Sequence, residues 1–277
     1  MTGAKKTALF TFYILLTGTV LLYILFPAGA VRDHIANRIN RESPEAQVAI
    51  GTLKLSFPAS VTLKDVAIEI NGDLLFIFDR LKLTPRWRSI FSTEKVFHFW
   101  AEAYGGEMSG LFSTGNSGGA ARVSASCSFS DMQLGQMPMV ASNLGDRLTG
   151  ILGGNFELEA SPRQAATGNG NIFITDCNFL MPVSFIDKDR LSFHQVEAEF
   201  ALKDSNLDIL NAEMQGPELT GKVSGSIFFE TPIERSEMDL VIAVTPLLSS
   251  PLSEINALTF RARETFDDPQ LTIVSAR

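Results

Sequence analysis

Residues 148–159 read LTGILGGNFELE, and residues 219–230 read LTGKVSGSIFFE. The two stretches share Leu-Thr-Gly at their first three positions, Gly at the seventh and Glu at the twelfth. After the seventh position, apolar and polar side chains alternate, which is the period of a half-buried β-strand. Neither copy contains histidine or cysteine. The repeat therefore indicates a structural unit, a glycine-bearing turn or bulge followed by an amphipathic strand, and not a duplicated catalytic site.

The same alternation continues through most of the chain. It begins in residues 47–70 and is followed by Asn71-Gly72-Asp73, a strong hairpin signal. Residues 113–121 read STGNSGGAA and predict a flexible loop, the most plausible internal break. Residues 138–145 read PMVASNLG and predict one short helix. Together these patterns predict an all-β, mostly antiparallel protein with few short helices.

Nearly every predicted strand is apolar on one side, and few helices are available to cover that side. A sheet of this kind buries its apolar face by closing into a sandwich, by curling into a trough, or by accepting a ligand or partner. The candidate residues for an apolar groove are those in phase along the predicted strands: Val96, Cys127, Phe129, Phe156, Leu158, Phe173, Ile227 and Phe229. The alternative is that they form an ordinary packed core.

The N-terminus predicts a membrane segment. Lys5 and Lys6 precede residues 8–26, which are 19 residues without a charge and long enough to span a bilayer. Positive residues before the span favour an N-terminus inside and the rest of the chain outside, which in a bacterium is the periplasm. The alternative is a cleaved signal peptide, because Ala28-Gly29-Ala30 has the small-x-small pattern of a cleavage site.

Residues 31–41 continue with helical spacing. The apolar positions lie on one side and three arginines on the other, so this helix either meets lipid headgroups or serves as a connector. The predicted organisation is a membrane anchor over residues 1–30, a juxtamembrane helix or linker over 31–46, and a β-domain over 47–277.

Composition and isolated residue types argue against several functions. The chain has 277 residues with 23 Lys and Arg against 31 Asp and Glu, and this acidity argues against a nucleic-acid partner. His34, His98 and His194 lie far apart without metal-ligand spacing, so we predict no metal, no cofactor and no catalytic residues. Cys127 and Cys177 are in phase with apolar neighbours, which favours core packing over a disulfide.

Several motifs carry a family resemblance when taken in order. Residues 48–70 read VAIGTLKLSFPASVTLKDVAIEI, and together with the preceding apolar segment they resemble the opening of the AsmA-like proteins. The two LTGxxxG strands and the ending FDDPQLTI are similar to the same superfamily, although its closing glycine is missing near Phe266. The order of apolar segment, SFP, short helix and LTGxxxG strands resembles the type II secretion system protein N family (GspN).

This resemblance implies an elongated, curved antiparallel sheet whose apolar groove contacts lipid. It further implies a non-enzymatic component of a type II protein secretion system, anchored in the inner membrane, with inner-membrane lipid and other secretion subunits as partners. The alternative function is a lipid-binding or lipid-transfer protein with a phospholipid ligand in the groove. A hydrolase is the least favoured alternative, because no catalytic constellation is found.

Overall fold

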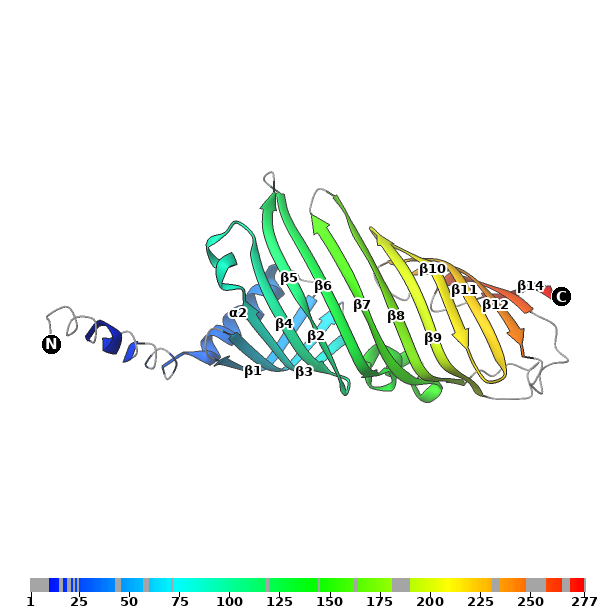
Figure 1. Ribbon diagram of the computed structural model, residues 1–277, viewed down its shortest axis with the longest axis horizontal. Coiled ribbons are helices and arrows are strands. Elements are labelled where there is room, and N and C mark those ends of the chain that lie inside the picture. Colours follow the sequence, from blue (N-terminus) through cyan, green and yellow to red (C-terminus); the bar gives the residue numbers. More distant parts are fainter. Residues whose placement is uncertain are drawn as a thin grey trace.

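The computed structural model describes residues 10–14, 17, 18, 21, 23, 25–42, 46–56, 60–70, 72–117, 120–143, 145–161, 164–180, 190–230, 235–247, 258–265 and 270–276. Within them the chain is all-β, as predicted, and forms one curved, open sheet (Figure 1). Its fourteen strands are antiparallel and follow one another in sequence order across the sheet.

The strands have the following bounds: β1 Ala46–Ser56, β2 Ser60–Ile70, β3 Asp73–Pro85, β4 Lys95–Ala103, β5 Gly106–Ser117, β6 Ala120–Gln133, β7 Leu148–Ser161, β8 Gln164–Leu180, β9 Arg190–Lys203, β10 Asn206–Gln215, β11 Leu219–Phe228, β12 Glu237–Pro246, β13 Leu258–Thr265 and β14 Gln270–Ala276. The helices that the structure describes with bounds are α2 Ala28–Glu42, η1 Trp87–Phe91, η2 Leu134–Gln136, α3 Pro138–Asn143 and η3 Gly145–Arg147.

Several local predictions are confirmed. The predicted turn at residues 71–73 joins β2 to β3, with Gly72 at φ +91. The predicted short helix is α3, and the amphipathic helix expected over residues 31–41 lies within α2. The two copies of the repeat begin β7 and β11, and Gly150 and Gly221 each occupy the third position of their strand.

At three aspartates the alternation of apolar and polar residues is offset by one position, yet the apolar side chains stay on one side of the sheet. Asp65 in β2, Asp131 in β6 and Asp176 in β8 have φ of 53, 59 and 51. The apolar residues on either side of each aspartate are three positions apart instead of two, yet they stay on the same face: Leu63 and Val66, Phe129 and Met132, Ile174 and Cys177. Such irregularities also increase the local twist of a strand, which favours a curved sheet.

Helix α2 covers the N-terminal end of the sheet. Its Val31 and Ile35 pack on a buried cluster formed by Leu53, Leu63 and Val66. The helix also satisfies backbone groups of β1, because Asn40 Oδ1 accepts from Val48 N at 2.8 Å and Arg32 Nη1 donates to Gly51 O at 3.0 Å. Unpaired edge groups of this kind otherwise invite pairing with another chain. Helix α2 thus protects the first strand of the sheet.

The rest of the sheet has no second layer among the described residues. Every substantial contact between two strands joins neighbours in the sequence, so the sheet does not close into a sandwich. Substantial helix contacts are confined to β1, β3, β4, β7 and β8. The accessible surface is 17621 Å², whereas a compact monomer of this mass would expose about 12,000 Å². The protein is therefore an open, single-layered sheet over most of its length.

Two expectations need correction. The predicted loop over residues 113–121 is wrong for its described part: β5 extends to Ser117 and β6 begins at Ala120. The second correction concerns residues 8–26, much of which falls outside the described residues. In the part of the chain that is described, no helix combines the length and the apolar character needed to cross a membrane. This finding overturns the predicted single-pass localisation in the bacterial inner membrane.

Candidate functional site: an apolar sheet face

One face of the sheet is apolar from β1 to β13, and we call it the apolar face. Paired residues in neighbouring antiparallel strands lie on the same side of a sheet, so the register traces rows across it. The first apolar row contains Leu53, Leu63, Leu81, Ala101, Met108, Phe129, Gly154, Ile172, Ala198, Ala212, Val223, Ile242 and Phe260. No polar side chain interrupts this row in thirteen successive strands.

A second apolar row runs beside the first. It contains Leu55, Val61, Leu83, Phe99, Gly110, Cys127, Phe156, Gly170, Phe200, Ile209, Gly225, Leu240 and Ala262. Two of its glycines, Gly110 and Gly170, lie beneath phenylalanine rings of the neighbouring strands. A Cβ at Gly110 would lie 2.8 Å from the Phe99 ring, and one at Gly170 would lie 2.7 Å from the Phe200 ring.

Most side chains of the two rows remain half-buried, although they are apolar. Phe129 and Phe156 face each other with ring centroids 6.4 Å apart and are both half-buried. Ile172, Phe200 and Leu240 are half-buried as well. The buried clusters lie beneath α2, around Tyr104 and Met132, and around Cys177 and Phe193. Within the rows, small side chains are also buried: Ala101, Cys127, Ala212 and Ala262.

The structure places five of the eight predicted groove residues on one face of the sheet. Cys127, Phe129, Phe156, Leu158 and Ile227 all lie on the apolar face. The assignment is wrong for Val96, which pairs with Ser113, and for Phe173, which pairs with Glu197; both belong to the opposite face. Phe229 lies just beyond β11, where its backbone N donates to Ser205 O at 2.7 Å.

The reason for the Phe173 error is the phase change at Asp176. Phe173 and Cys177 are four residues apart, so simple alternation places them on one face. Asp176, with its positive φ, lies between them and reverses the alternation. Val96 lies an even number of residues before His98 and Trp100, so it shares their side of β4. Those two residues pair with Leu111 and Ser109 on the face opposite the apolar face.

The opposite face, which we call the polar face, separates its charges along the sheet. Cations gather on β1–β3, where Lys54, Lys64, Arg80 and Lys82 lie. Carboxylates gather on β7–β10, at Glu157, Glu159, Glu197, Glu199, Asp208 and Glu213. The two faces therefore differ in what they can bind, since one offers apolar surface and the other offers charge.

The two cysteines contribute to the apolar face as free, buried thiols. Gly170 is two strands from Cys127 in the second apolar row, and Cys177 lies seven residues further along β8, which is about 23 Å. That separation is too large for a disulfide, so the interpretation as core residues is confirmed. Burial raises the pKa of the Cys127 thiol to about 11 and also raises that of Cys177.

We expect both thiols to resist thiol reagents in the folded protein. With a pKa of about 11, only about one Cys127 thiol in a thousand is ionised at pH 8, and the thiolate is the reactive form. Titration with a chromogenic disulfide reagent should find two thiols only after denaturation. Rapid reaction of the native protein would show that these side chains are more open than the structure indicates.

The described residues include no cluster of metal-ligating side chains. No group of three or more histidine, cysteine, aspartate or glutamate side chains there could hold a metal ion. The three histidines lie on different elements, His34 in α2, His98 in β4 and His194 in β9. What the described part of the chain offers chemically is a long apolar surface.

Comparisons with known proteins returned no match to any protein-family model, curated protein or solved structure. The resemblance to the AsmA-like and type II secretion protein N families therefore depends on the quoted motifs alone.

Proposed function

We propose that this protein is a non-enzymatic lipid-binding protein that holds acyl chains against its apolar face. The observation that carries the proposal is the pair of uninterrupted apolar rows, which remain half-buried because no second layer covers them in the described structure. Contiguous exposed apolar patches of more than a few hundred Å² are rare on monomers and mark binding surfaces.

The dimensions of the apolar face suit several acyl chains. Thirteen strands spaced by about 4.8 Å give each row a length of about 58 Å. One leaflet of a bilayer has a hydrocarbon thickness of about 15 Å, which is half of the full core. Each methylene group removed from water contributes about 0.8 kcal/mol. A chain of lipid length therefore finds enough apolar surface to be held without any specific polar contact.

Lipid analysis of the purified full-length chain tests this proposal. We expect mass spectrometry of an organic extract to recover phospholipid in stoichiometric amount, and the delipidated protein to take up a fluorescent phospholipid. A protein that is purified free of lipid and takes up none would refute the proposal.

A second proposal is a non-enzymatic component of a type II secretion system. Its specific support is that the motifs behind the resemblance fall on regular elements in the implied order, with β1 and β2 first, then α3, then β7 and β11. In a deletion strain, failure of secretion with normal lipid composition would favour this second proposal. Altered lipid composition with intact secretion would favour lipid binding alone.

A further inference from the structure

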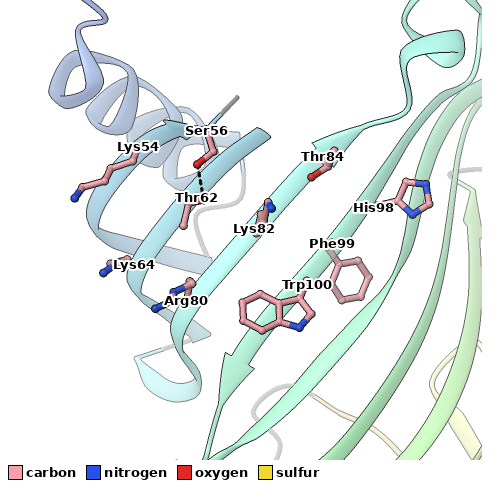
Figure 2. A pocket seen from close by; sticks show the side chains of 10 residues that line it. All are labelled: Lys54, Ser56, Thr62, Lys64, Arg80, Lys82, Thr84, His98, Phe99 and Trp100. Carbon is pink, nitrogen blue, oxygen red and sulfur yellow. Dashed lines mark hydrogen bonds between the residues drawn. The ribbon is translucent and has the colours of Figure 1, made fainter. Parts of the chain in front are cut away.

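The polar face of the first four strands forms a basic hollow. It has a volume of about 550 Å³, and its lining includes Lys54, Lys64, Arg80, Lys82, His98 and Trp100 (Figure 2). The register explains the grouping. Lys54, Thr62, Lys82 and Trp100 form one row across β1–β4, and Lys64 pairs with Arg80 in the next row. None of the described residues that line the hollow carries a carboxylate.

Most of this positive charge is not neutralised. No ion pair or hydrogen bond within the described residues involves the ammonium groups of Lys54, Lys64 or Lys82. Among the described residues Arg80 pairs with Glu102 at 3.5 Å, and the two side chains are 44% and 35% exposed; so solvated a pair contributes little. The chain as a whole carries a net charge of -8, so this cluster is opposite in sign to the rest of the protein.

The connection between β3 and β4 displays large apolar side chains next to this hollow. Trp87 and Phe91, at the two ends of η1, are 54% and 93% exposed. Arg86 and Arg88, on either side of Trp87, are exposed too. The connection leaves β3 shortly after Thr84 and enters β4 shortly before His98, and both of these residues line the hollow (Figure 2).

This connection is ordered by its own hydrogen bonds. The buried Ser89 donates from Oγ to Arg86 O at 2.7 Å, and Val96 N donates to the same Oγ at 3.0 Å. Ser92 Oγ donates to Ser89 O at 3.0 Å, and Lys95 Nζ donates to Ser92 O at 2.8 Å. The exposed aromatic side chains are therefore held outward by a defined turn.

We propose that the basic hollow and η1 together form a peripheral docking surface for a bilayer that contains anionic lipid. The lysines and arginines meet the headgroup phosphates, and Trp87 and Phe91 enter the interface. Tryptophan favours the membrane–water interface, and phenylalanine is among the apolar residues that interfacial segments bury there. Each nearby Lys or Arg adds about 1 kcal/mol of attraction to an anionic surface. A soluble anion or a nucleic acid would explain the charge but would leave Phe91 without a function.

The docking surface does not depend on the proposed acyl-chain binding. The lysines lie on the polar face, whereas the two apolar rows lie on the other side of the same strands. Lipid extraction tests the rows, and the fluorescence measurement below tests the docking surface. Either proposal can fail while the other holds.

Intrinsic fluorescence reports on this surface directly, because the chain has two tryptophans and both belong to it, Trp87 in η1 and Trp100 in β4. In a full-length Trp100→Phe variant, Trp87 is the remaining reporter. With vesicles of phosphatidylcholine and phosphatidylglycerol, we expect its emission to shift to the blue and to be quenched by lipids brominated in their acyl chains. High salt should weaken the effect, since the Debye length at 1 M is about 3 Å.

Charge-reversal variants supply the matched comparison. Lys82→Glu removes one positive charge and adds one negative charge, so it should weaken partitioning to the mixed vesicles about thirtyfold. Lys203→Glu, at an exposed position at the end of β9, should leave it unchanged. Phe91→Ser should weaken it while preserving its salt dependence.

Three results would overturn the docking surface. The first is a Trp87 emission wavelength that does not change when vesicles are added. The second is a blue shift that depends on protein concentration without lipid, which would indicate self-association. The third is a shift produced by an oligonucleotide and not by vesicles.

Discussion

Replacement of Gly225 by alanine is expected to lower the free energy of unfolding by about 3 kcal/mol or more. Gly225 lies in β11 with φ +138, a conformation that L-residues rarely adopt. A Cβ there would lie 2.1 Å from the carbonyl oxygen of Asp239 and 2.9 Å from Leu240 Cα, both backbone atoms of the neighbouring strand. Because backbone cannot move aside as a side chain can, β11 and β12 would separate locally.

Gly221→Ala provides a control within the same strand. A Cβ at Gly221 would meet the methyl end of Met214 at 2.3 Å, and its nearest backbone atom is Ala243 O at 3.4 Å. The flexible methionine can turn away, so the loss should be below about 1 kcal/mol. Urea unfolding followed by circular dichroism measures both variants. Equal losses would contradict the geometric distinction.

These expectations explain why the chain repeats its LTGxxxG motif. The seventh-position glycine of the first copy, Gly154, would likewise place a Cβ 2.3 Å from a neighbouring carbonyl oxygen, that of Asn171. Both copies thus need glycine where two strands approach closely. The sequence repeat predicted a structural unit, and the contacts give the physical reason at the seventh position.

Local patterns predicted the strands well because each depends on neighbouring residues. The turn at Gly72 and the shared face of Cys127 and Phe129 follow from backbone geometry and from the period of a strand. The phase changes at Asp65, Asp131 and Asp176 were also visible, as apolar residues spaced by three. Treating such a spacing as a bulge would have placed Phe173 on the correct face.

The covering of the apolar face could not be predicted from the same patterns. A sandwich and an open sheet require identical alternation, since each strand presents one apolar side in both. What separates them is contact between distant strands, and here every substantial strand contact joins sequence neighbours. The basic hollow was missed for a related reason, because Lys54, Lys64 and Lys82 are scattered in sequence and meet only through the register of three strands.

The second large effect concerns charge on the apolar face, and it depends on what covers each position. Leu63 is 7% exposed in the cluster beneath α2. We expect Leu63→Asp to cost about 4 kcal/mol or more, because a buried leucine is lost and an unpaired carboxylate replaces it. Phe156 is half-buried in the second apolar row, beyond the reach of α2. A carboxylate at position 156 can stay hydrated, so Phe156→Asp should cost about 1–2 kcal/mol.

Phe156→Asp should also remove much of the bound lipid, because it places a charge between Cys127 and Gly170 in the middle of the second apolar row. Thermal unfolding followed by circular dichroism, combined with lipid extraction, distinguishes the cases. A folded Phe156→Asp protein that has lost its lipid, beside an unfolded Leu63→Asp protein, would support an open apolar face. If Phe156→Asp unfolds as readily as Leu63→Asp, the residues around Phe156 are a closed core, and acyl chains have no place there. If Phe156→Asp folds and retains all of its lipid, the lipid is bound elsewhere and the apolar rows are not its site.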